Sequence, residues 1–357
     1  MSPPRISEHQ DHFALLRMAA ATLVLYSHQH ALTGLPEPSV IGVHSLGGLG
    51  VVMFFAISGF LVAQSWQSDP HVLRFAQRRL LRIWPGFAVA VLMCLAVLGP
   101  MFSPLSWGDY WRDPRTTEYL HNLVFLLRAG LPLSFEGSSL PHAVNGSLWT
   151  IPLELKCYAV LVTLGMAGVL RRAWLVTLLA IALSVFYAGW QLRGEWLVQQ
   201  WSLAIEQQYL IEFGAAFLIG VTLRLQWSWV RQRLAWLCTG SIGLGALAFS
   251  QGRPVLTFLL VVPLITIAFG VQSWPVLRRF DRWGDLSFGT YLYAFPIQQT
   301  LISVLGRHLG WWPLLALVLI CTLTMGWLSW HLVEKPSQRF KPRRPLVPAS
   351  RPMALTT

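Results

Sequence analysis

Apolar runs of roughly twenty residues recur along the whole chain, and they constrain its fold more than any other feature. A run of about 20 apolar residues is what a helix needs to cross the hydrocarbon core of a bilayer. Charged residues make up 12% of the 357 residues, against about 25% in ordinary soluble domains. The sequence therefore predicts an all-α, polytopic membrane helix bundle.

The runs predict about ten transmembrane helices. They lie at about 13–32, 46–66, 84–103, 147–169, 172–191, 204–224, 233–250, 254–272, 286–306 and 311–333. No hydrophilic stretch is long enough for a separate soluble domain. We expect residues 1–336 to form one membrane domain, followed by a basic, proline-rich cytoplasmic tail at 337–357.

Charge predicts the orientation of these spans. Ten spans place both termini on one side, and 20 of the 27 Lys and Arg residues fall on that side when loops are assigned alternately. Cytoplasmic loops carry the excess of Lys and Arg, so both termini are predicted to be cytoplasmic. This topology accounts for the net charge of +12, and no nucleic-acid partner is expected.

The cysteines and the N-terminus predict little further chemistry. Four cysteines lie far apart inside apolar runs and lack metal-ligand spacing, so we expect neither disulfides nor a metal site. The first run follows His9, Asp11 and His12 and has no small-residue cleavage site, so no cleavable signal peptide is expected.

His28 is the leading candidate for a functional residue, because an ionisable side chain deep in a membrane span is costly. It follows Arg17 by eleven residues, about 16 Å along a helix. Glu154 lies about two turns into the fourth span, which runs the opposite way. Both are predicted at similar depth, where a carboxylate can orient an imidazole. The alternative is that each only hydrogen-bonds a neighbouring helix.

Two arginines suggest a phosphate site. Arg79 and Arg82 are three residues apart and share a helix face. Guanidinium groups bind phosphate with bidentate geometry. The alternative is a positively charged anchor at the cytoplasmic surface, and Arg17 at similar depth would favour the phosphate site.

Six short motifs follow one another along the chain. They are Leu16–Ala21 with Tyr26–His28, Phe54–Leu61, Arg79–Pro85, Ser147–Glu154 with Cys157–Tyr158, Leu286–Tyr293 and Val333–Pro336. In content and order they resemble the motifs of the bacterial integral-membrane acyltransferase-3 family, from about 13 to 336. One departure is Ala294, where many members carry a histidine.

The resemblance implies a membrane O-acyltransferase in the bacterial inner membrane. It would move an acetyl group from cytoplasmic acetyl-CoA to a hydroxyl of a cell-surface or exopolysaccharide glycan, or of its lipid-linked precursor. The implied partners are acyl-CoA, the glycan acceptor, the bilayer and the polysaccharide biosynthesis machinery.

The family motifs also assign roles. Arg17, Arg79 and Arg82 would hold the donor phosphates. His28 would act as a general base or carry the acyl group transiently, with Glu154 orienting it. Two further side chains, Tyr158 and Ser287, are candidate local donors or acceptor contacts, although buried hydroxyls more often have structural hydrogen bonds.

Two other classes of function fit the same residues. Buried His, Glu and Arg also suit a transporter or flippase for a glycan or a polyprenyl-linked intermediate. Only an enzyme needs acyl-CoA, which separates these readings. A purely structural membrane scaffold would leave His28 and Glu154 unexplained.

Overall fold

The computed structural model describes residues 12–128, 130–192, 205–272, 274 and 284–342, and this part of the chain is almost entirely helical. The longer helices are α1 (Phe13–Leu32), α2 (Leu46–Ser68), α3 (Val72–Met93), α7 (Thr150–Met166), α8 (Ala173–Leu192), α10 (Ile205–Leu225), α12 (Leu234–Ser250), α13 (Pro254–Gly270), α14 (Ser287–Leu305) and α15 (Trp311–Ser329).

Short elements connect them. They are β1 (Ser39–Val40), β2 (His44–Ser45), α4 (Gly99–Phe102), α5 (Trp107–Arg112), α6 (Pro114–Tyr119), α11 (Trp227–Gln232), α16 (Lys335–Gln338), the 3-10 turns η2 (Leu120–Val124) and η3 (Val169–Arg171), and the π-helical turns η1 (Cys94–Leu98) and η5 (Trp330–Glu334). The two strands form a small antiparallel hairpin between α1 and α2.

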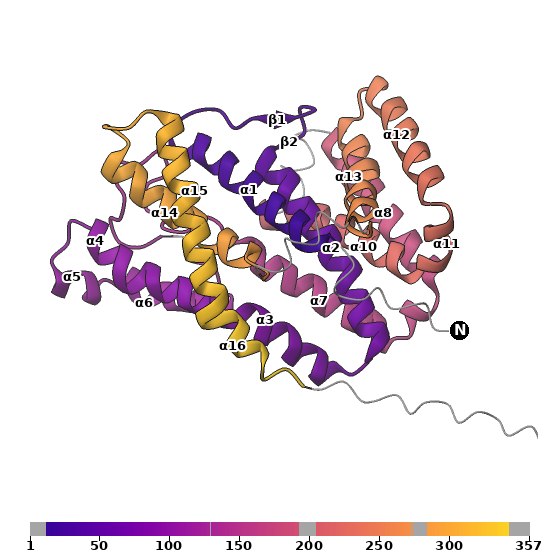
Figure 1. The fold of residues 1–357 in the computed structure, drawn as a ribbon, viewed down its shortest axis with the longest axis horizontal. Helices are drawn as coiled ribbons and strands as arrows, with labels where there is room; N and C mark the ends of the chain where they lie inside the picture. Colours follow the sequence, from indigo (N-terminus) through magenta and orange to yellow (C-terminus); the bar gives the residue numbers. More distant parts are fainter. Residues whose placement is uncertain (1–11, 129, 193–204, 273, 275–283, 343–357) are drawn as a thin grey trace, which may run out of the picture.

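The bundle is centred on α1 and α2 (Figure 1). α14 and α15 lie on one flank of this pair, where α14 packs against α1. α8, α10, α12 and α13 gather on the other flank, where α10 and α13 pack against α2. α3 contacts α14 and η5 and completes the side on which the arginines lie.

α2 and α10 approach each other so closely that their backbones touch. A Cβ atom added at Gly59 would lie 2.0 Å from the carbonyl oxygen of Phe217, and one added at Gly220 would lie 2.2 Å from that of Ala56. Small residues permit such close helix packing in membranes. The contact fixes the position of α2, which supplies one wall of the site described below.

The all-α fold predicted from the apolar runs is confirmed, since a helix occupies most of every predicted span. In the described part of the chain, five helical stretches are long and apolar enough to cross a membrane: 46–68, 72–102, 173–191, 207–225 and 311–338. The count of ten and the cytoplasmic termini stay predictions. Several arginines used to predict orientation (Arg5, Arg193, Arg278, Arg279, Arg282, Arg343, Arg344 and Arg351) lie outside the described residues.

The long segment between α4 and α7 folds back into the bundle. The side-chain amide of Asn145 donates to the carbonyl oxygen of Leu292 at 2.9 Å. Gly146 lies directly against the ring of Phe295. Both partners are in the middle of α14, so α7 begins inside the bundle and not at its surface.

We expect Gly220→Val to destabilise the protein strongly, because its side chain has no room beside the Ala56 carbonyl. Overpacking typically costs about 1–3 kcal/mol. Thermal unfolding of the detergent-purified protein measures the effect. Gly240→Val on α12 is the matched control, since a Cβ there meets no atom within 4 Å. Equal stability of the two variants would contradict the close contact.

Candidate active site

A cavity of about 120 Å³ lies where α1, α2, α3, α7 and α14 meet. Its polar lining consists of Arg17, Ser58, Arg79, Arg82, Thr150, Glu154, Tyr158, Ser287 and Tyr291. Typical ligand pockets measure about 300–1,000 Å³. The cavity therefore has room for a slender part of a ligand and not for a whole nucleotide.

The three arginines of the proposed phosphate site line this one cavity. Arg79 and Arg82 lie on the same face of α3, as their spacing predicts, and Arg17 reaches them from α1. The sequence predicted the third span from about residue 84, but α3 begins at Val72, so Arg79 and Arg82 project from the body of the helix and not from its start.

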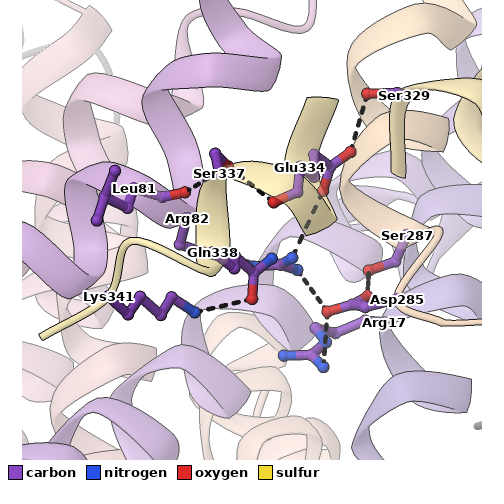
Figure 2. Close-up of polar contacts among 10 residues, drawn as sticks. All are labelled: Arg17, Leu81, Arg82, Asp285, Ser287, Ser329, Glu334, Ser337, Gln338 and Lys341. Carbon is purple, nitrogen blue, oxygen red and sulfur yellow. Dashed lines mark hydrogen bonds and ion pairs between the residues drawn. The ribbon is translucent and has the colours of Figure 1, made fainter. Parts of the chain in front are cut away.

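Two of these arginines converge on Asp285, just before α14 (Figure 2). Arg17 Nη2 lies 3.0 Å from Asp285 Oδ2, and Arg82 Nη2 donates to the same oxygen. Ser287 Oγ donates to the other oxygen, Oδ1, at 2.6 Å. Burial raises the pKa of Asp285, but the opposite effect of Arg17 and Arg82 is larger and brings the pKa down to about 2. The carboxyl group is therefore ionised at neutral pH.

Arg82 has a second acidic partner. Its Nη1 lies 3.5 Å from Glu334 Oε2, and the Glu334 side chain is completely buried. Glu334 ends the π-helical turn η5 and also accepts a hydrogen bond from Ser329 Oγ at 2.9 Å (Figure 2). π-helical turns inside α-helices often occur at functional sites. Here the turn ends on the residue that holds Arg82.

Arg79 has a different environment. Its guanidinium lies 5.7 Å from the centre of the Phe75 ring and interacts electrostatically with Glu154 and Tyr158. No residue in the described part of the chain forms an ion pair with it, and its buried Nε has no hydrogen-bond partner there. Of the three cavity arginines, Arg79 is thus the one whose guanidinium has no carboxylate partner among the described residues, which leaves it for a ligand.

Glu154 belongs to a compact hydrogen-bonded group in the cavity wall. Its Oε1 accepts from Ser58 Oγ at 2.6 Å and from Tyr158 Oη at 2.5 Å. The two hydroxyl groups lie 3.0 Å apart. The Tyr158 hydroxyl thus donates to a carboxylate one turn away on α7. This is a structural hydrogen bond of the kind that buried hydroxyls more often form.

His28 lies elsewhere. It is not among the described residues that line the cavity. Its ring meets the ring of Phe295 edge-to-face at 5.2 Å. Its buried Nδ1 has no hydrogen-bond partner among the described residues. The carboxylate that interacts electrostatically with His28 is Glu37, which also accepts a hydrogen bond from the hydroxyl of Ser27.

The expectation that His28 and Glu154 lie at one depth is wrong. Gly47 at the start of α2 packs directly on Ser27, the neighbour of His28. Ser58, which binds Glu154, follows Gly47 by eleven residues, about 16 Å along the helix. Because the segment before α7 enters the bundle, Glu154 lies with the arginines, and Glu37 takes the place expected for it beside His28.

Sequence reasoning missed Glu37, Ser58, Asp285 and Glu334 as members of these groups. Ser58 and Glu334 stood inside recognised motifs but received no role. Asp285 carried a usable signal, since a carboxylate two residues before Ser287 adjoins a predicted span end that is rich in arginine. Ala294, the departure from the family motif, packs with Leu25, Leu315 and Val318. Its surroundings are apolar.

Comparison with known proteins agrees with the motifs. A family model described as an acyltransferase domain matches residues 12–331. The chain belongs to the acyltransferase-3 family. The membership, with the apolar helices, marks it as a membrane acyltransferase.

Two relatives are similar over nearly their whole length. An "O-acetyl transferase" of Shigella phage Sf6 is 32% identical over 333 residues, which cover 90% of this chain and 94% of that protein. "Nodulation protein 10" of Rhizobium leguminosarum bv. viciae is 30% identical over 368 residues, 94% of this chain and 95% of that protein. No solved structure shows a significant match to the chain. The family and the first relative support O-acyl transfer.

The separation of the two carboxylates leads to a test. Because Glu37 adjoins His28 and Glu154 adjoins Arg79, we expect Glu37→Gln to lower kcat and Glu154→Gln mainly to raise the KM of the acyl donor. Steady-state kinetics of the two purified variants measures the difference. The reverse pattern, with Glu154→Gln acting on kcat alone, would restore Glu154 as the partner of His28.

Proposed function

We propose that the protein is an O-acetyltransferase of the bacterial inner membrane. It transfers an acetyl group from cytoplasmic acetyl-CoA to a hydroxyl of a cell-surface or exopolysaccharide glycan, or of the lipid-linked precursor of that glycan. The observation that carries the proposal is the cavity lined by three arginines, in a chain of the acyltransferase-3 family.

The donor site follows from charge and shape. Acyl-CoA has a polyanionic nucleotide and a long, thin pantetheine arm. Guanidinium groups suit the phosphates, and a cavity of about 120 Å³ suits the arm. The nucleotide would stay at the mouth, on Arg17, Arg79 and Arg82, while the arm enters between α2, α7 and α14.

His28 is the proposed general base. The acceptor hydroxyl oxygen forms a bond to the thioester carbon as His28 takes the hydroxyl proton. The C–S bond then breaks, and the proton passes to the leaving CoA thiolate. The neighbouring Glu37 carboxylate stabilises the cationic imidazole. Transient acylation of His28 is the alternative route. Tyr291 lines the cavity, and Phe295, one turn further, contacts His28, so the thioester must pass these rings.

The transporter or flippase considered from the sequence would use the same buried charges. Family membership favours the transferase. A transporter would have no need of acyl-CoA, so turnover of radiolabelled acetyl-CoA by the purified protein separates the two functions.

We expect Arg79→Ala to raise the KM of acetyl-CoA about tenfold or more, because hydrogen bonds to charged groups contribute about 1.5–3 kcal/mol. Arg79→Lys should restore only part of the affinity, since an ammonium group cannot form the bidentate contact. Release of free CoA thiol measures the rate. Arg171→Ala, at an exposed position outside the cavity, is the control. Equal effects at both positions would make Arg79 a surface anchor.

We expect His28→Ala to reduce transfer by about 10²–10⁴-fold, the usual contribution of a general acid or base. A strain lacking the gene is complemented with the wild type or with His28→Ala, and ester-linked acetate on its surface polysaccharide is measured. Matched protein levels in the membrane fraction are the control. Normal acetate with the variant would remove His28 from catalysis. Normal acetate without the gene would refute the glycan acceptor.

A further inference from the structure

We propose that Asp285 is a displaceable counter-ion that competes with the donor phosphates for Arg17 and Arg82 and thereby sets the donor affinity. The inference rests on the proposed acyl-CoA site. It assigns to Asp285 a role in positioning and selecting the donor, without contact to the reacting atoms.

The geometry places one carboxylate oxygen where a phosphate oxygen would bind. Asp285 Oδ2 contacts both Arg17 Nη2 and Arg82 Nη2, which come from two different helices (Figure 2). Phosphate and carboxylate oxygens use the same N–H groups of arginine. A phosphate that binds these two N–H groups must therefore take the place of Oδ2.

The second acid of the group is held much more firmly. Glu334 lies within a helical turn, its side chain has no exposed area, and Ser329 binds its other oxygen. Asp285 precedes the first turn of α14, and 15% of its side chain is exposed. Glu334 can keep Arg82 oriented while Asp285 exchanges with a ligand.

The charges of the group make the competition strong. Arg17 and Arg82 carry two positive charges, and Asp285 and Glu334 carry two negative charges when ionised. A polyanionic donor meets little net attraction at these two arginines until Asp285 withdraws. Ser287 lines the cavity and binds Asp285 Oδ1, so it holds the carboxylate in its position against the two arginines.

The competition involves phosphate and not the acyl-carrying arm. Asp285 is not among the described residues that line the cavity. A donor that lacks phosphates therefore does not compete with it. This difference separates a counter-ion from a residue that merely shapes the site.

The test compares acetyl-CoA with acetyl-pantetheine, which has the same thioester arm without phosphates. For Asp285→Asn in the purified full-length protein, we expect the KM of acetyl-CoA to fall by roughly three- to tenfold, because one charge-assisted competitor is removed. Product inhibition by CoA should tighten by a similar factor. The KM of acetyl-pantetheine should not change. Asp113→Asn is the control. Asp113 Oδ2 pairs with Arg115 Nη2 at 2.7 Å, and neither residue lines the cavity.

Three outcomes overturn the inference. A rise in the KM of acetyl-CoA would make Asp285 a support for the arginines. Equal changes for both donors would show a general effect on the site. An unchanged KM would show no competition.

Ser287→Ala is the second variant, for use if Asp285→Asn does not fold. It removes the hydrogen bond that holds the carboxylate, so it should also lower the KM of acetyl-CoA. A rise would contradict the proposal. Failure of the wild type to use acetyl-CoA refutes the proposed function instead.

Discussion

Two arginines and the carboxylates that compensate them are the constraint on which the arrangement around the cavity depends. Buried charges cost several kcal/mol when unpaired, and ionisable groups at membrane depth face the bundle interior. Arg17 belongs to α1, Arg82 to α3, Asp285 precedes α14, and Glu334 lies in η5. Pairing these four side chains requires four segments that are distant in sequence to meet at one end of the bundle.

The rest of the molecule holds His28 and Glu37 at a distance from the arginines and their carboxylates. The backbone contact between α2 and α10 fixes α2, whose length separates Gly47 beside Ser27 from Ser58 beside Glu154. His28 also follows Arg17 by eleven residues on α1, which is about 16 Å along that helix. Such a separation suits the proposed reaction, in which a charged donor stays at one face and its thin arm delivers the acyl group further inside.

The sequence predicted the features that depend on one helix at a time. The bounds of α1 agree with the first apolar run, and the shared face of Arg79 and Arg82 follows from their spacing. The predicted family is confirmed because its motifs are short, local and ordered along the chain. The same local reasoning placed Arg17 at the end of its span nearest the other arginines.

What it could not predict depends on how segments enter the bundle and which helices face each other. Depth was counted for Glu154 from an assumed surface start of its span, whereas Asn145 and Gly146 are already bound to the middle of α14. Glu154 therefore lies away from the predicted depth, and Glu37 is the carboxylate near His28. The sequence did not predict the role of Asp285, because a single acid near many arginines is typical of surface charge. Its role follows from the structure, in which Arg17 and Arg82 share one of its oxygens. In a membrane bundle, phosphate binding therefore depends less on how many arginines lie near a span end than on how many of them lack a carboxylate partner. Among the three arginines of this site, the one without such a partner in the described part of the chain is Arg79.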